Sequence, residues 1–332
     1  MKAIYFEQGG QASVLRYSDV NNPSRCGIDQ VLIRLMSIGI NPIDTKIRLA
    51  PERFPVNFPV IPGCDGAGIV EAVGSNVQNF KPRDEVYFSQ PGFNNRQGTY
   101  AEYVVVDASL LALKPQSLSF AEAAAIPLVF ITAWEALHDR THMNSGQKIL
   151  IHAGAGGVGH AAIQLAKLAG AHVITTVSSD EKADFVARLG ADKIINYRTH
   201  DVVAEVMNWT EGKGVDIAFD TVGANILQSC FDCVKYYGDV VTILQPNSET
   251  NWSDARIRNV RFSFEMMLTP VWMEMEQAKL HQAEILKQCA ILFEENKLIV
   301  EIARTFNLEE AAAAHNFLEQ NHPIGKLVLS VD

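Results

Sequence analysis

The strongest constraint on the fold of this chain is a regular alternation of short apolar runs and helical patterns that begins near residue 147. Runs of this length are typical of buried strands, and the helical patterns between the first four runs give intervals that fit βαβ units. The pattern predicts an α/β fold with a doubly wound parallel sheet of the Rossmann type. The runs are KILIH (148–152), HVITTV (172–177), KIIN (193–196), VDIAF (215–219), VVTIL (240–244) and VRFSF (260–264).

The first 120 residues predict a different architecture. They contain Pro- and Gly-rich turns and short strand-like runs with little helical periodicity, which indicates a β-rich domain. A single long helix from Phe120 to Leu137 is expected to join this domain to the sheet. The strand-like runs are QVLIRLM (30–36), AGIVEAV (67–73), DEVYF (84–88) and YAEYVVV (100–106).

The C-terminal segment predicts two further helices, from Met273 to about Asn296 and from Leu308 to Gln320, and a last strand, GKLVLSV (325–331). This segment has no glycine loop of its own, so we expect it to complete one of the other domains. A chain of 332 residues is too long for one compact core, and about two domains are expected.

Composition and charge limit the classes of binding partner and the cellular location that we expect for this protein. The formal net charge of −10 disfavours nucleic acid and anionic membrane surfaces as partners. The N-terminus lacks a signal-peptide pattern, and the most apolar window, 121–137, is too short and too charged to span a bilayer. Five cysteines in such a chain predict free thiols, and we expect a cytoplasmic protein.

Gly154, Gly156 and Gly159 form a G-x-G-x-x-G motif directly after the first predicted strand and at the start of a helical pattern. In this context the motif predicts a cradle for the pyrophosphate of a dinucleotide. Gly154 permits the tight turn, Gly156 lets the backbone approach the phosphates, and Gly159 lets the helix lie close to the strand. The expected cofactor contacts of the loop and of the fifth run are Gly154, Gly156, Gly157, Val158, Gly159 and Leu244.

The end of the second predicted strand distinguishes NAD from NADP. A carboxylate there would bind the ribose 2′-hydroxyl of NAD, whereas this strand ends in Val177 and Ser178 without an acid. The Ser178 hydroxyl and the Lys182 ammonium can hold the 2′-phosphate of NADP. Two alternatives stay open: Asp180 or Glu181 turns toward the ribose, or Lys182 is a solvated helical lysine.

Taken in order, a series of motifs resembles the medium-chain dehydrogenase/reductase superfamily, and within it the zinc-free quinone oxidoreductase branch related to zeta-crystallin. The resemblance covers nearly the whole chain. Its motifs are GINPIDTKIR (39–48), PGCDGAGIVEAVG (62–74), GTYAEYVVV (98–106), AAAIPLVFITAWEAL (123–137), AGAGGVG (153–159), INYR (195–198), DTVG (220–223) and GKLVL (325–329).

The resemblance implies a Rossmann domain, residues 125–265, inserted in a discontinuous GroES-like catalytic domain, residues 1–124 and 266–332. The active site is expected in the cleft between the two domains. The resemblance also implies a homodimer that pairs the strand 260–264, and NADPH as the cofactor. Ser178, Lys182 and Tyr197 match the residues that hold the 2′-phosphate in NADPH-using members.

The resemblance implies that no zinc is bound. Zinc-dependent relatives have a cysteine where this chain has Asn41, and a His-Glu pair where it has Cys64 and Asp65, so the ligand set is incomplete. Cys230 and Cys233 have C-x-x-C spacing, but they lie on a helical pattern that favours buried thiols.

The resemblance further implies that Asn41, Asp44 and Thr132 line the nicotinamide end of the cleft. Simpler readings stay open: Asn41 as a turn former before Pro42, Asp44 as a cap, and Thr132 bonded to its own helix. Lys46 departs from the tyrosine of bacterial quinone reductases. It either enters the pocket and polarises a substrate carbonyl or is a surface charge.

These residues predict an enzyme that transfers a hydride from C4 of NADPH to a quinone or a conjugated carbonyl compound without zinc. Three alternatives stay open: an NADPH-dependent 2-alkenal or enone reductase, a zinc-type alcohol dehydrogenase, and a non-catalytic NADPH-binding protein. The expected partner is a small electrophile. The sequence does not identify it, because the presumed pocket segments, 46–58 and 89–97, are irregular.

Overall fold

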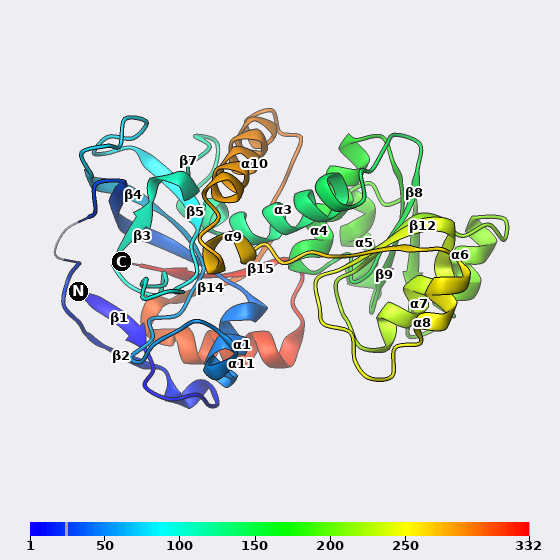
Figure 1. The fold of residues 1–332 in the computed structure, drawn as a ribbon, viewed down its shortest axis with the longest axis horizontal. Coiled ribbons are helices and arrows are strands. Elements are labelled where there is room, and N and C mark those ends of the chain that lie inside the picture. Colours follow the sequence, from blue (N-terminus) through cyan, green and yellow to red (C-terminus); the bar gives the residue numbers. More distant parts are fainter. Residues whose placement is uncertain (24–25, 332) are drawn as a thin grey trace. The chain divides into compact units, whose positions relative to one another are not determined.

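A computed structural model describes residues 1–23 and 26–331. The chain forms two compact units (Figure 1). The central unit is Val129–Met267, and the terminal unit combines Met1–Leu128 with Leu268–Asp332. The C-terminal segment therefore completes the N-terminal domain, as expected from its lack of a glycine loop.

The central unit is built on a six-stranded parallel sheet in the order β10-β9-β8-β11-β12-β13. The first strand of the unit, β8, lies in the middle of the sheet. β9 and β10 follow on one side of it, and β11, β12 and β13 follow on the other, as in a Rossmann fold. Each strand coincides with a predicted apolar run, although β12 begins six residues earlier than its run. The strands are β8 (Lys148–Ile151), β9 (His172–Val177), β10 (Lys193–Asn196), β11 (Val215–Asp220), β12 (Val234–Thr242) and β13 (Arg261–Phe264).

Helices cover the central sheet because the apolar stripe of each one packs against the strands. α4 and α5 contact β8, β9 and β10, whereas α7 contacts β11 and β12 and also its neighbours α6 and α8 (Figure 1). Cys230 and Cys233 lie on α7 and are buried in the core, as their helical spacing predicted. The helices are α4 (Gly157–Leu168), α5 (Asp180–Arg188), α6 (Val202–Trp209), α7 (Asn225–Cys233) and α8 (Trp252–Ile257).

The terminal unit contains a seven-stranded sheet in the order β14-β15-β3-β4-β5-β7, with β6 paired to β3. All pairs are antiparallel except β14 with β15, which agrees with the predicted β-rich GroES-like domain. A separate hairpin-like pair joins β1 (Lys2–Tyr5) to β2 (Arg16–Asp19). The sheet strands are β3 (Gln30–Ile40), β4 (Asp65–Val73), β5 (Glu85–Ser89), β6 (Tyr103–Asp107), β7 (Leu111–Leu113), β14 (Ile302–Asn307) and β15 (Lys326–Ser330).

The helices of the terminal unit include the two predicted for the C-terminal segment, α10 (Glu276–Glu294) and α11 (Ala311–Asn321). α11 is preceded by a 3₁₀ turn, Leu308–Glu310. The shorter helices are α1 (Pro42–Leu49), α2 (Phe120–Ala124) and α9 (Thr269–Trp272).

The prediction of one long helix from Phe120 to Leu137 was wrong. α2 ends at Ala124, α3 (Pro127–Trp134) begins anew, and a π-helical segment, η4 (Glu135–Arg140), follows it. Pro127 lacks a backbone N–H and disfavours helical geometry in the residue before it, so it starts a helix here instead of continuing one. The break places the first N–H groups of α3 outside the intrahelical ladder, and the one on Leu128 donates to a buried carboxylate described below.

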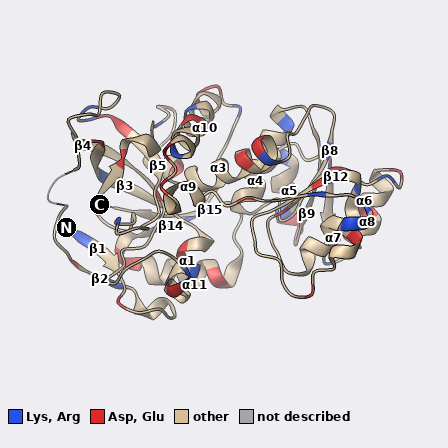
Figure 2. Ribbon diagram, viewed as in Figure 1, with Lys and Arg blue, Asp and Glu red and all other residues tan. Residues whose placement is uncertain are grey.

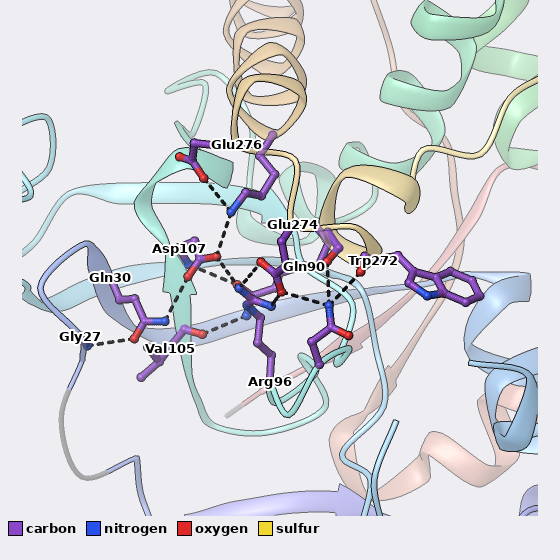
Figure 3. A network of polar contacts seen from close by, with 12 residues as sticks. Gly27, Gln30, Gln90, Arg96, Val105, Asp107, Trp272, Glu274 and Glu276 are labelled. Atoms are coloured by element: carbon purple, nitrogen blue, oxygen red, sulfur yellow. Dashed lines mark hydrogen bonds and ion pairs between the residues drawn. The ribbon is translucent and has the colours of Figure 1, made fainter. Parts of the chain in front are cut away.

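A polar network fixes the irregular segment 89–97 of the terminal unit (Figure 3). The Arg96 guanidinium donates to Asp107 Oδ2 at 3.0 Å and to Glu274 Oε2 at 2.9 Å. Asn94 Nδ2 donates to the carbonyls of Val271 and Trp272 at 3.1 and 3.0 Å. These long-range bonds hold the segment against α9, which explains why its local sequence gave no pattern.

Acidic and basic residues are interspersed over the helices and strands of both units (Figure 2). The longest helix, α10, has 19 residues and carries several charges. Throughout the part of the chain that the structure describes, no helix combines the length and the apolar character that a membrane crossing needs.

Candidate functional site

The glycine loop joins β8 to α4 and leaves open space at one of its three motif glycines. A Cβ atom on Gly154 would lie 2.1 Å from Thr175 Oγ1, and one on Gly159 would lie 2.3 Å from the Ala153 carbonyl. A Cβ on Gly156 would meet only that same carbonyl, at 3.2 Å. Gly154 and Gly159 are therefore required by packing, whereas Gly156 borders space that a phosphate group can fill.

The start of α4 presents backbone N–H groups at the same place. Gly156 caps the helix with φ −78° and ψ 175°, an extended conformation that any residue can adopt. Gly156, Gly157 and Val158 are partly exposed, whereas Gly154 and Gly159 are buried. The first N–H groups of a helix lack intrahelical acceptors and carry positive partial charge, so this surface fits a pyrophosphate.

Thr176 holds the loop in place, a role that the sequence analysis missed. Its hydroxyl accepts the Ala153 N–H at 3.0 Å, and its carbonyl accepts the Gly154 N–H at 3.1 Å. Ala153 has φ 49°, a left-handed conformation that costs energy in a non-glycine residue. The sequence pattern predicts Thr176 only as a residue of the second strand, because nothing local links it to Ala153, 23 positions earlier.

The ends of β9 and β10 bring the residues predicted for the 2′-phosphate together. Asn196 pairs with Val177, and the Tyr197 N–H donates to the Val177 carbonyl at 3.1 Å, so Tyr197 lies beside the Val177–Ser178 strand end. Lys182 lies in the first turn of α5, where its N–H donates to the Ser179 hydroxyl at 3.4 Å. Ser178 and Lys182 are half-buried and Tyr197 is exposed, so this edge is accessible to a ligand.

Two further charged features border this edge. Arg198 follows Tyr197 and is exposed, which adds a cation that the sequence analysis did not single out, although it ends the INYR motif. Asp180 and Glu181 are exposed in the first turn of α5.

The ends of β11 and β12 are tied together by Asp220. Its Oδ1 accepts the N–H groups of Val222 and Gly223 at 2.9 and 2.8 Å, and its Oδ2 accepts the Thr242 hydroxyl at 2.8 Å. Leu244 packs against Gly223, where a Cβ would lie 2.7 Å from Leu244 Cδ1. Leu244 therefore lies at the carboxyl edge of the parallel strands, where ligands bind in such sheets.

In the terminal unit, Asn41 and Asp44 belong to a fully buried polar cluster. Asn41 follows β3 and caps α1, and its backbone N–H donates to Asp44 Oδ2 at 2.8 Å. Asn41 Nδ2 donates to Asp65 Oδ2 at 2.9 Å, and Lys326 Nζ donates to Asn41 Oδ1. Asp44 thus does cap a helix, but Asn41 is more than a turn former because its side chain joins residues from two strands, β4 and β15.

Asp65 is the centre of this cluster, whereas the sequence analysis named it only as part of an incomplete zinc-ligand set. Besides Asn41, it accepts the Leu128 N–H at the start of α3, at 3.1 and 3.2 Å from its two oxygens. Lys326 Nζ lies 4.0 Å from Asp65 Oδ2. Burial raises the pKa of Asp65, and the nearby Lys326 ammonium opposes that rise.

Burial governs the other ionisable groups of the cluster. It raises the pKa of Asp44 to about 7, with a hydrogen bond from Asn41 acting in the opposite direction. It also lowers the pKa of Lys326, an effect that Asp65 opposes. Asp65 and Lys326 thus each oppose the effect that burial has on the pKa of the other.

The other two predicted site residues are Thr132 and Lys46. Thr132 is a buried residue of α3 and belongs to the central unit, so its role beside Asn41 stays a prediction. Lys46 is exposed on α1, although partial burial of its ammonium lowers its pKa. It is exposed together with Pro42 and Leu49, whereas Asp44 is fully buried.

The cluster continues through Tyr100 to His315, which makes a testable contribution to stability. Tyr100 OH lies 2.9 Å from His315 Nε2, and burial lowers the pKa of His315 to about 3 from its ordinary value of 6.5. Below pH 6.5 the unfolded chain takes up a proton at this histidine that the folded chain does not, so the stabilising effect is complete above 6.5 and is lost toward pH 3.

We therefore expect wild type to lose more free energy of unfolding than His315→Gln when the pH falls from 7 to 5, by about 2 kcal/mol. Urea denaturation at both pH values measures the difference. Parallel losses in the two proteins would contradict the assignment of a neutral buried His315.

The comparisons with known families agree with this geometry. Residues 27–116 match the alcohol dehydrogenase GroES-like domain, and residues 189–329 match the zinc-binding dehydrogenase domain. The quinone oxidoreductase of Pseudomonas aeruginosa is 33% identical over 99% of both chains, and the 2-haloacrylate reductase of a Burkholderia species is 33% identical over 99% of this chain and 98% of its own. A zinc-type alcohol dehydrogenase-like protein of Staphylococcus aureus is 32% identical over 91% of both chains.

Solved structures give the same result. An alcohol dehydrogenase superfamily protein of Novosphingobium aromaticivorans has a TM-score of 0.93 at 33% identity and full coverage of both chains. The Escherichia coli quinone oxidoreductase in complex with NADPH has a TM-score of 0.89 at 28% identity, over 99% of this chain and all of that one. The chain belongs to the medium-chain dehydrogenase/reductase superfamily, in its quinone oxidoreductase branch. It is thus an NAD(P)-dependent oxidoreductase.

The buried residues around Asn41 do not fit the catalytic zinc ion that some relatives' names imply. Zinc binds deprotonated thiolate, imidazole or carboxylate ligands. Asn41 stands where a zinc ligand would be a cysteine, and it carries a neutral amide whose Oδ1 already accepts a bond from the Lys326 ammonium group. Among residues 1–23 and 26–331, no three His, Cys, Asp or Glu side chains form a group that could hold a metal ion.

Proposed function

We propose that this protein is an NADPH-dependent oxidoreductase that transfers a hydride to a quinone or a conjugated carbonyl compound without zinc. The observation that carries the proposal is the open cradle at Gly156, followed on the same sheet edge by a strand end that has no carboxylate. The similarity to quinone oxidoreductases over nearly the whole chain supports the reaction class.

The choice of NADPH over NADH rests on Ser178, Lys182 and Tyr197. Lys182 supplies a positive charge, and the two hydroxyl side chains supply donors for a phosphate dianion. Arg198 adds a second cation beside Tyr197. The E. coli relative whose structure contains NADPH supports the same choice.

Bound NADPH supplies the hydride, so the protein's own task is to orient the electrophile and to stabilise the charge that develops on its oxygen. Asn41 Nδ2 is the donor that we assign to this oxygen. A preorganised donor in a site without water stabilises an oxyanion more strongly than water does. Lys46 is a second candidate donor, and its lowered pKa is consistent with partial removal from water.

A second candidate function is an NADPH-dependent reductase of 2-alkenals, enones or related unsaturated compounds. The 33% identity to a 2-haloacrylate reductase favours it, since that protein's name specifies a conjugated substrate. Both candidates share the same hydride acceptor chemistry and differ in the electrophile.

A panel assay tests the proposal and separates the alternatives. Purified protein in a chelator-containing buffer is given NADPH with quinones, 2-alkenals, haloacrylates, simple ketones and alcohols, and oxidation of the cofactor is followed. We expect turnover with quinones or conjugated carbonyls and none with simple ketones. Chelator-sensitive oxidation of alcohols would instead identify a zinc-type alcohol dehydrogenase, and tight NADPH binding without any turnover would identify a binding protein.

We also propose that two copies pair through β13 in the cytoplasm. β13 ends the central sheet, so its outer edge has unpaired backbone groups, and Phe264 is 54% exposed there. The five free cysteines are consistent with a reducing compartment. Analytical ultracentrifugation should give a dimer that Phe264→Lys weakens; an unchanged mass would contradict this interface.

A further inference from the structure

Lys326 is a buried lysine whose position is set by strand pairing. It begins β15, which pairs with β3 so that Leu327 lies opposite Ile40, the residue before Asn41. Lys326 is 4% exposed, and its Nζ donates to the Ile40 carbonyl at 2.9 Å and to Asn41 Oδ1. Its ammonium therefore donates hydrogen bonds within the terminal unit, one of them to the side chain that we assign to the substrate oxygen.

The two partners of the Asn41 amide have opposite chemistry. An ammonium group only donates hydrogen bonds, and an ionised carboxylate only accepts them. With Lys326 at Oδ1 and Asp65 at Nδ2, both contacts are satisfied. A rotated amide would turn its NH₂ group toward the ammonium and its oxygen toward the carboxylate, so that both contacts become repulsive. The pair therefore allows one orientation of the amide.

This orientation fixes the direction of the Asn41 donor group. Asn41 is fully buried, and among residues 1–23 and 26–331 the acceptor of its Nδ2 group is Asp65. We propose that Lys326 is a positioning residue, which fixes the orientation of the Asn41 amide and thereby of the donor that we assign to the oxygen of the electrophile. The inference rests on the proposed function and deepens it by assigning a role to a residue of the closing GKLVL segment.

Lys114 provides a matched control within the same unit. It is also buried, and its Nζ donates to the carbonyls of Pro115 and Leu118 at 2.9 and 2.6 Å and pairs with Glu85 at 3.1 Å. Neither of these carbonyls belongs to the Asn41 cluster. A purely structural buried lysine should behave like Lys114.

The first experiment compares Lys326→Met, Lys326→Gln and Lys114→Met in steady-state assays with NADPH and the best electrophile of the panel. We expect Lys326→Met to lower kcat by about 10- to 100-fold, because a misoriented donor loses contact with the reacting oxygen. KM for NADPH should stay within about twofold of wild type, since the cofactor contacts lie in the central unit. Lys326→Gln keeps a donor and should recover most of kcat, and Lys114→Met should leave kcat unchanged.

The second experiment is a double-mutant cycle with Asn41→Ala, read by both kcat and melting temperature. If Lys326 acts through Asn41, Lys326→Met should lower kcat in wild type but not in the Asn41→Ala background. The melting temperature should show the same coupling, with the two losses failing to add by ~2 °C or more. The thermal cycle needs no turnover, so it remains informative for a variant or a protein without measurable activity.

The outcomes separate this inference from the proposed function. Equal losses of kcat from Lys326→Met in both backgrounds, or additive melting temperatures, would overturn the positioning role while the wild-type reaction stands. Absence of any turnover by the wild-type protein across the panel would overturn the proposed function, and with it the assignment of Asn41 to a substrate oxygen.

Discussion

Gly156→Val is expected to weaken NADPH binding by about 100-fold or more while the protein stays folded. The backbone of Gly156 is extended, with φ −78° and ψ 175°, so a branched residue fits the conformation. Its Cβ would meet only the Ala153 carbonyl, at 3.2 Å. The remaining atoms would fill the space assigned to the pyrophosphate and remove several charge-assisted hydrogen bonds at the helix N-terminus.

Isothermal titration with NADPH, NADH and NADP⁺ measures this effect, and thermal unfolding provides the control for folding. NADPH and NADH should lose affinity equally, because the pyrophosphate is common to both. Wild-type affinity in the folded variant would show that the cofactor does not approach Gly156, and would remove the main support for the cradle.

Lys182→Ala should weaken NADPH binding by about 10- to 100-fold and change NADH binding by no more than about twofold. The expected loss corresponds to one charge-assisted hydrogen bond to the 2′-phosphate, which NADH lacks. Lys182 lies in the first turn of α5, beside the edge that Ser178 and Tyr197 form. The measurement is KM and Kd for both cofactors at matched ionic strength.

Lys213→Ala is the control for Lys182→Ala. Lys213 is a lysine of the central unit with a side chain 78% exposed, and its partner Glu211 is equally exposed, so its replacement should affect neither cofactor. If Lys182→Ala reduced the affinity for NADPH and NADH alike, Lys182 would not read the 2′-phosphate, and the preference for NADPH would have to arise elsewhere.

The central sheet was predictable because its determinants are local. Each strand is a short apolar run, and the connections between the first four runs carry a helical stripe, which together are typical of βαβ units. The prediction of one long helix from Phe120 was wrong for a local reason, because Pro127 favours the first turn of a helix over its interior. The contacts of the irregular segment 89–97 could not be predicted for a non-local reason, since Arg96 finds its carboxylate partner at Glu274, 178 positions away.

The residues of the candidate site also fall into those that a local sequence pattern identifies and those that only tertiary contacts bring together. The glycine loop and the end of β9 are continuous stretches of sequence, so their residues were found. The partners of Asn41 were not, because Asp65 lies 24 positions away and Lys326 lies 285 positions away. Nothing in the local pattern of GKLVL distinguishes a lysine that starts a strand from one that binds an amide. Only the pairing of β15 with β3 brings them together.

The most direct test of the central claim is the ratio of kcat/KM for NADPH to kcat/KM for NADH, measured with a quinone and with a 2-alkenal on chelator-treated protein. We expect turnover of at least one of these electrophiles and a ratio of about 10 or more in favour of NADPH, consistent with one charged contact to the 2′-phosphate. A ratio below one, or activity that appears only when zinc is restored, would contradict the account.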